Sequence, residues 1–124
     1  MNTDDKKRIL IVDDEADVCT MLADYFTKKG FIADVAYNGK DALAAVQSER
    51  PDLIILDVVM PEIDGFKVLE TLKSDPVYYQ IPIIMLTRKS GPKSMDRGIS
   101  LNAEFYLPKP CTTDNLMDFV NMIL

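Results

Sequence analysis

Five polar side chains stand just after the apolar runs of this sequence: Asp13, Asp14, Asp57, Thr87 and Lys109. Carboxylates brought close together repel one another and raise one another's pKa unless a cation lies between them. Their oxygen atoms suit a hard divalent ion such as Mg²⁺, which uses few carboxylates and keeps several waters. A carboxylate beside such an ion and an ammonium group can attack phosphorus and form an aspartyl phosphate, while the ammonium and a hydroxyl neutralise the phosphoryl oxygens. This chemistry requires a fold that gathers the five side chains.

Apolar runs predict the strands of that fold. Ile9–Val12, Leu53–Leu56 and Ile83–Leu86 are rich in branched residues and show no alternation. Such runs are typical of strands that are covered on both faces, as in a parallel sheet between helices. Two weaker runs, Phe31–Ala36 and Phe105–Leu107, bring the number of predicted strands to five.

Apolar residues at helical spacing predict a helix after each strand. The predicted helices span Glu15–Lys29, Gly39–Glu49, Gly65–Ser74, Pro92–Ile99 and Asp114–Leu124. Asn38, Asp64 and either Thr112 or Thr113 are predicted N-caps, and Gly30 is a predicted stop for the first helix. Asp14 has two open interpretations, as a cap of that helix or as part of a polar site.

Strict alternation of strand and helix predicts an α/β fold with a parallel sheet and helices on both faces. Five strands suit the doubly wound order 2-1-3-4-5, whose ligand crevice lies at the carboxyl ends of strands 1 and 3. Because parallel strands end at one edge, we expect the five polar side chains to meet there. No repeat or linker interrupts the pattern, so residues 1–124 are expected to form one domain.

The composition excludes several classes of protein. With 14 basic and 20 acidic residues and a formal charge of −6, direct contact with nucleic acid is not expected. The absence of histidine excludes imidazole zinc sites and Ser-His or Cys-His nucleophiles. Cys19 and Cys111 have no CxxC spacing and are predicted to be reduced core residues. Neither a signal sequence nor a membrane span is present, so a cytoplasmic location without membrane contact is expected.

Four motifs then occur in a specific order: Ile-Leu-Ile-Val-Asp-Asp-Glu at 9–15, Asp-Val-Val-Met-Pro-Glu-Ile-Asp-Gly at 57–65, Leu-Thr at 86–87 and Tyr-Leu-Pro-Lys-Pro at 106–110. With these motifs, the sequence resembles the receiver domain of two-component response regulators. The resemblance covers about Lys7 to Leu124 and includes the chemotaxis receivers. The resemblance implies a flavodoxin-like fold. Since the strand order given above is also that of this family, the two expectations are not independent.

The resemblance implies a role for each site residue. Asp57 is the expected phosphoacceptor for a histidine kinase's phosphohistidine. Asp13, Asp14 and Asp57 are expected to bind Mg²⁺ together with the backbone carbonyl of Val59. Lys109 is expected to pair with the phosphoryl oxygens and to precede a cis peptide bond.

A second implication concerns a conformational switch. Thr87 and Tyr106 are the expected switch pair, with the hydroxyl moving toward the phosphoryl group and the ring turning inward. This movement would change the surface of the fourth helix, fifth strand and fifth helix, where partners or a second copy would bind. The expected partners are a sensor histidine kinase or phosphotransfer protein and a downstream output domain or protein, which residues 1–124 do not include. Such a domain is not a conventional enzyme, because it turns over only its own phosphoryl group.

Some residues depart from the family pattern. Arg88 and Lys89 follow Thr87, where a small residue is common, and Asn102-Ala103 replaces the common Gly-Ala before the last strand. The basic stretch, with Lys93 and Arg97, has three interpretations: a solvated loop, a contact to phosphate, or a docking site for an acidic partner. Lys89 with Arg88 could cover a phosphoryl group, and Val59 offers no hydrogen bond to water, so we expect a long-lived phosphorylated form.

Other functions fit the sequence less well. A flavodoxin-like cofactor carrier needs a phosphate-binding loop after the first strand, where this chain has acids. A Mg²⁺-dependent phosphatase with an aspartyl nucleophile usually has an acid two residues later, and Val59 stands there. The main alternative is a receiver-fold module that only binds proteins and is not phosphorylated.

Overall fold

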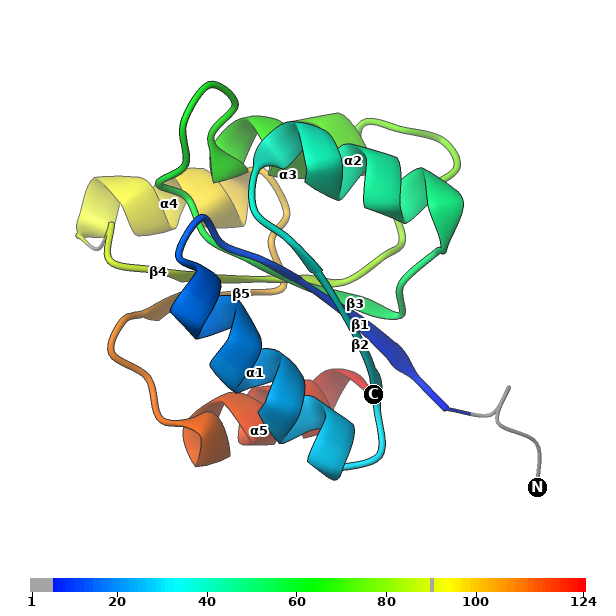
Figure 1. The fold of residues 1–124 in the computed structure, drawn as a ribbon. Coiled ribbons are helices and arrows are strands. Elements are labelled where there is room, and N and C mark those ends of the chain that lie inside the picture. The colour runs from blue at the N-terminus through cyan, green and yellow to red at the C-terminus, as the bar shows by residue number, and fades with distance from the viewer. Residues whose placement is uncertain (1–5, 90) are drawn as a thin grey trace.

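Strands and helices alternate along the chain in a computed structural model that describes residues 6–89 and 91–124 (Figure 1). In chain order the elements are β1 (Arg8–Val12), α1 (Ala16–Lys28), β2 (Ile32–Ala36), α2 (Gly39–Ser48), β3 (Leu53–Leu56), α3 (Gly65–Lys73), β4 (Ile83–Thr87), α4 (Pro92–Ser100), β5 (Phe105–Pro108) and α5 (Thr113–Ile123). Every predicted strand and helix is present, with ends that differ by at most one residue. Among the described residues, no helix is long and apolar enough to cross a membrane.

The five strands form one parallel sheet, as the alternating pattern predicted, in the expected doubly wound order β2-β1-β3-β4-β5. The register aligns the last residues of the central strands, because Val12 pairs with both Ala36 and Leu56. The backbone N–H of Asp57 continues this pairing by donating to the Val12 carbonyl at 3.0 Å. The residues that follow β1 and β3 therefore leave the sheet at the same level.

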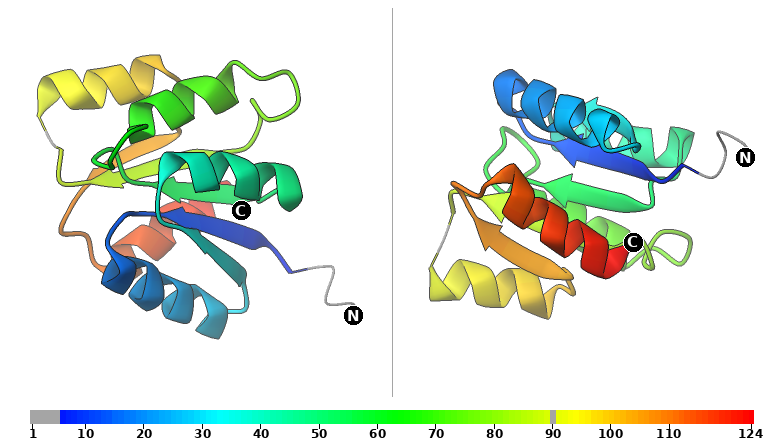
Figure 2. Two further views of the ribbon diagram at one scale, coloured as in Figure 1. Left: turned by 45° about the horizontal axis from the view of Figure 1, so that its top comes forward. Right: turned by 90° about the horizontal axis from the view of Figure 1, so that it is seen from below.

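Helices cover both faces of the sheet: α1 and α5 lie on one face, and α2, α3 and α4 on the other (Figures 1 and 2). Alternate residues of β1 enter different cores, with Leu10 and Val12 on the α2–α3–α4 side and Ile9 and Ile11 on the α1–α5 side. All four are at most 2% exposed. Burial on both faces explains why the sequences of the central strands are unbroken apolar runs.

Side-chain caps fix where three of the helices begin. Asn38 accepts from the N–H of Asp41, Asp64 from that of Lys67, and Thr112 from that of Asn115, at 2.8, 2.9 and 3.1 Å. Each bond satisfies an N–H that has no partner within its helix. Of the two predicted caps of α5, Thr112 is the one used.

At the other end of α1, Gly30 has φ +96°, a left-handed conformation that suits glycine at a helix stop. The two cysteines differ from the prediction in one respect. Both are free, and Cys19 is buried, but Cys111 is partly exposed because it lies in the loop between β5 and α5.

Candidate functional site

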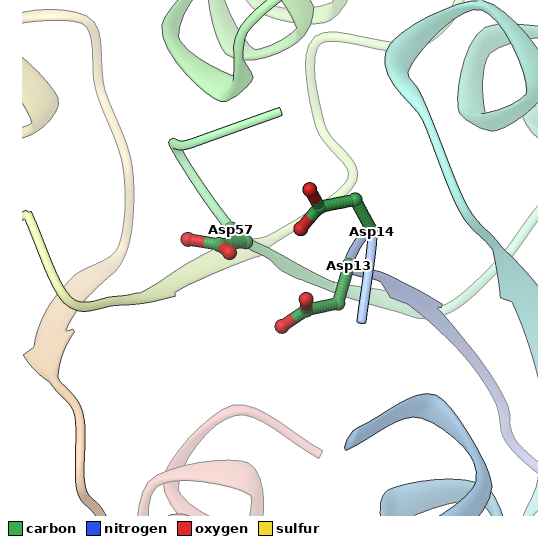
Figure 3. Close-up of side chains that lie close together, drawn as sticks. All are labelled: Asp13, Asp14 and Asp57. Atoms are coloured by element: carbon green, nitrogen blue, oxygen red, sulfur yellow. The ribbon is translucent and has the colours of Figure 1, made fainter. Parts of the chain in front are cut away.

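Three carboxylates meet at the carboxyl edge of the sheet. Asp13 and Asp14 follow β1, Asp57 follows β3, and one ligand oxygen of each lies within 4.8 Å of the others (Figure 3). Asp13 and Asp57 are 3% and 5% exposed, whereas Asp14 is exposed to solvent. Asp14 does not cap α1: the N-cap Glu15 makes no side-chain cap bond, and its N–H donates to Asp13 Oδ1 at 2.9 Å. Of the two interpretations of Asp14, the structure supports the polar site.

Lys109 supplies the cation among these carboxylates. Its Nζ lies 2.6 Å from Asp13 Oδ2 and 3.4 Å from Asp57 Oδ2. Its backbone N–H donates to the Thr87 carbonyl at 2.9 Å, and the following bond to Pro110 is cis, as the resemblance implied. The Lys109 side chain is only 11% exposed, so the lysine is a partner of buried acids, as its predicted place among them requires.

Burial and ion pairing act in opposite directions on the charged groups of the cluster. Burial raises the pKa of the Asp13 carboxyl, against the lowering effects of Lys109 and the Glu15 N–H. Burial lowers the pKa of Lys109, but the hydrogen bond to Asp13 and the charges of Asp57 and Asp13 outweigh it, so the net shift is upward. The site therefore holds three carboxylates and one ammonium, with an excess of negative charge that favours a further cation.

A small cavity of about 200 Å³ opens beside these carboxylates and is lined by Asp14, Glu15, Asp57, Val59 and Arg88. Val59 is 55% exposed, and its N–H donates to Asp57 Oδ1 at 3.4 Å. Arg88 also lines a larger cavity of about 550 Å³ on the α1 side of the edge, together with Lys109 and Cys111. Arg88 thus stands between the two cavities, a position that its place after Thr87 did not reveal.

The predicted switch residues are both buried near this edge. Thr87 is fully buried, and its Oγ1 accepts from the Lys89 N–H at 3.1 Å. Tyr106 is 7% exposed, its ring is turned inward, and its hydroxyl donates to the Lys89 carbonyl. Burial raises the pKa of the Tyr106 phenol. The backbone of Lys89 therefore joins the two residues, a link that the sequence did not indicate.

Two glycines of the site were not singled out from the sequence. A Cβ on Gly65 would lie 2.1 Å from the Asp57 carbonyl oxygen, and one on Gly98 would lie 2.5 Å from the Tyr106 ring. Gly65 also donates its N–H to the Val58 carbonyl at 2.8 Å, which holds the start of α3 against the Asp57 backbone. The Asp-Gly pair at 64–65 was a signal for the first close approach; nothing in the sequence marked the second.

Comparison with known proteins agrees with this geometry. The sequence model of the response regulator receiver domain matches residues 9–121. The chain belongs to this family, and it is a receiver domain of a two-component response regulator. The alkaline phosphatase synthesis transcriptional regulatory protein PhoP of Bacillus subtilis is 36% identical over 118 residues, which cover 95% of this chain and 48% of PhoP. The chain spans about half the length of the curated relatives it matches.

Solved structures share the whole fold. The chemotaxis protein CheY4 of Vibrio cholerae superposes with a TM-score of 0.90 at 30% identity, covering 96% of this chain and 99% of CheY4. The signal receiver domain of a signal transduction histidine kinase from Syntrophus aciditrophicus gives a TM-score of 0.88 at 35% identity, covering 95% and 89% of the two chains. A transcriptional regulatory protein, a chemotaxis protein and a receiver domain of a histidine kinase therefore all resemble this chain.

Proposed function

We propose that Asp57 accepts a phosphoryl group and that the domain changes its α4–β5–α5 surface in response. The observation that carries this proposal is the buried cluster in which Lys109 lies 2.6 Å from Asp13 and 3.4 Å from Asp57. A cation already placed against the acceptor carboxylate is the group needed on incoming phosphoryl oxygens.

A divalent metal fits the donor set of the site. Asp13, Asp14 and Asp57 offer oxygen atoms within 4.8 Å of one another, and oxygen ligands with few carboxylates suit Mg²⁺. These three residues would hold the ion, together with the backbone carbonyl of Val59 that the resemblance implies. When bound, Mg²⁺ would neutralise charge on the acceptor carboxylate and on the phosphoryl oxygens.

The residues of the chain would divide the transfer among them. An Asp57 carboxylate oxygen attacks phosphorus, a P–O bond forms, and the bond from phosphorus to the donor nitrogen of a phosphohistidine breaks, so that the imidazole leaves and takes up a proton. Lys109, which already faces Asp57 Oδ2, holds a phosphoryl oxygen. The Thr87 hydroxyl is the donor for another, and its turn toward the phosphoryl group would release the Lys89 N–H.

The implied partners follow from the family. The phosphoryl donor is a sensor histidine kinase or a phosphotransfer protein, and the recipient of the signal is an output domain or protein. Receiver domains are generally not conventional enzymes; here the proposed turnover is the phosphorylation and dephosphorylation of Asp57 alone. On α4, Met95 and Ile99 are 38% and 57% exposed, which supports this face as a contact surface for partners or a second copy.

Intact-mass measurement after incubation with acetyl phosphate tests the proposal. We expect one added phosphoryl group in the presence of Mg²⁺, none in EDTA, and none in Asp57→Asn. Asp52→Asn, at the opposite end of β3, is the matched control and should be labelled like the unchanged protein. Labelling that persists in Asp57→Asn, or that proceeds equally in EDTA, would overturn the proposal, and absence of labelling in the unchanged protein would favour the receiver-fold module that only binds proteins.

A further inference from the structure

At Gly98, helix α4 carries no side chain where it meets the ring of Tyr106. Gly98 is the buried residue of this helix, and a Cβ there would lie 2.5 Å from Tyr106 Cδ2 and 3.0 Å from Cε2. Real Cβ atoms are essentially never found that close to another heavy atom. The backbone of Gly98 is helical and its φ is not in the left-handed region, so the conformation does not require glycine. Glycine is also a poor helix former, so neither the conformation nor helix stability at position 98 favours it.

The Tyr106 ring is held on its other sides as well. It stacks on Phe66 of α3, with ring centroids 6.3 Å apart and an interplanar angle of 14°. The guanidinium of Arg97 lies 4.4 Å from the centroid of the Phe66 ring, a distance at which a cation is attracted to an aromatic ring. The Tyr106 hydroxyl is fixed by the Lys89 carbonyl. The ring thus fits a place bounded by α3, α4 and the loop before α4.

We propose that Gly98 is a positioning residue: its missing side chain admits Tyr106 to the inward place, and through this contact α4 responds to the position of the ring. The inference rests on the proposed function of Asp57. Three contacts link Thr87 to α4 in sequence: Thr87 Oγ1 to the Lys89 N–H, the Lys89 carbonyl to the Tyr106 hydroxyl, and the Tyr106 ring to Gly98. A ring that left this place would remove the support of α4 at Gly98, so ring and helix move together.

A double-mutant cycle tests the contact without any phosphorylation. Gly98→Ala is made in the unchanged protein, in Tyr106→Ala and in Tyr106→Phe, and the urea midpoint of unfolding is measured. Alanine forms helix better than glycine, so we expect the substitution to raise the midpoint where no ring is present. We expect it to lower the midpoint in the unchanged protein and in Tyr106→Phe, where the ring remains. A rise in all three backgrounds would overturn the proposal; failure of Gly98→Ala to fold while the Tyr106→Ala background tolerates it would support it.

The position of the ring gives a second readout. In protein with ¹³C-labelled tyrosine, Tyr106→Phe identifies the Tyr106 resonance, and half-exposed Tyr79 serves as an internal reference. Gly98→Ala should move the Tyr106 phenol into water, so that it ionises near the ordinary value of about 10 and its contacts with Phe66 disappear from the NOE spectrum. An unchanged Tyr106 resonance and titration would overturn the proposal, because a purely structural glycine would leave the ring in place.

The response to a phosphoryl mimic separates this inference from the proposed function. Amide shifts of α4 are recorded with and without beryllofluoride and Mg²⁺. We expect the unchanged protein to respond at both Asp57 and α4, and Gly98→Ala to respond at Asp57 while losing most of the shift on α4. If the unchanged protein does not respond at Asp57, the proposed function fails; if Gly98→Ala responds on α4 like the unchanged protein, the role of Gly98 fails.

Discussion

The two ends of β1 carry similar charges in different surroundings. At its start, Arg8 lies 2.5 Å from Asp34 and 3.8 Å from Glu49, and its N–H donates to Asp52 at 2.7 Å. Just after its end, Lys109 contacts Asp13 and Asp57, with Asp14 beside them. Each end therefore has one cation and three carboxylates.

The difference between the two ends is exposure to water. The side chains of Asp34 and Glu49 are 43% and 67% exposed, whereas those of Asp13 and Asp57 are 4% and 6% exposed. Water and salt screen the charges around Arg8, so the excess of acid costs little there. Around Lys109 the same excess is held in a less polar environment, where a further cation is needed. Burial, and not the number of acids, separates a site from a surface ion pair.

Magnesium binding should show the largest difference between the two ends. Two unit charges 4 Å apart interact by about 1 kcal/mol even in water, so removing one charge beside a divalent ion weakens binding at least ~30-fold. We therefore expect Asp13→Asn to lose Mg²⁺ affinity by that factor or more. Asp34→Asn, in the middle of the neighbouring strand β2 and paired with Leu10, should change it less than about twofold, because roughly 10 Å of strand separates Leu10 from Asp13 and solvent screens the exposed carboxylate.

Calorimetric titration of Mg²⁺ into the two variants measures this contrast, and the rise in Tm on adding Mg²⁺ gives an independent check. The unchanged protein and Asp34→Asn should show the same rise. Equal losses of affinity in both variants would mean that the net charge of the domain, and not the buried cluster, controls binding.

Removing the cation at each end sharpens the comparison in terms of stability. Lys109→Met keeps the aliphatic part of the side chain but leaves buried Asp13 without a charged partner, and we expect a loss of about 2 kcal/mol in the free energy of unfolding without metal. Mg²⁺ should recover part of this loss. Arg8→Met should cost less than ~1 kcal/mol, since its partners are exposed, and Mg²⁺ should recover none of it. Urea unfolding of both variants, with and without Mg²⁺, measures these free energies. Equal losses of unfolding free energy at the two ends would contradict the role given to burial.

The sequence was sufficient to predict the fold and the convergence of the site. Both depend on patterns that are local in the chain: unbroken apolar runs for the strands, and polar residues directly after them. Parallel pairing then brings the ends of β1 and β3 together whatever the connecting helices contain. The caps Asn38 and Asp64 were predictable for the same reason, because a cap bonds to a residue three positions away.

Features that depend on the packing of distant residues were not predictable. The sequence placed Lys109 among the acids, but the low exposure of its side chain, 11%, depends on how the sheet edge packs, which no local pattern in the sequence records. The fit of Gly98 to Tyr106 joins a helix and a strand through a contact that leaves no periodic pattern. The cavity beside Asp57 is likewise lined by Arg88, whereas the sequence favoured its neighbour Lys89 as the residue that covers a phosphoryl group.

The lifetime of the phosphorylated form should give the smallest effect, and it depends on these two neighbours. Hydrolysis needs a water molecule in line with the bond between phosphorus and Asp57, so groups beside Asp57 that exclude water slow it. Arg88 lines the cavity next to Asp57 and Val59, and its guanidinium can pair with two phosphoryl oxygens. The Lys89 side chain does not line that cavity; it is the backbone of Lys89 that bonds to Thr87 and Tyr106.

We therefore expect Arg88→Ala to release phosphate about threefold faster than the unchanged protein, which corresponds to roughly 0.6 kcal/mol at the transition state. Lys89→Ala, the matched control, should change the rate by less than about 1.5-fold, because its backbone contacts remain. Phosphate release after removal of the donor measures both, at one Mg²⁺ concentration that saturates each variant. A larger effect of Lys89→Ala would show that Lys89, the residue that the sequence favoured, excludes water from the phosphoryl group. If neither variant changes the rate, access of water is set by the backbone of the loop after β4, and Val59→Asn becomes the substitution that should accelerate hydrolysis, because an amide beside Asp57 can hold the attacking water.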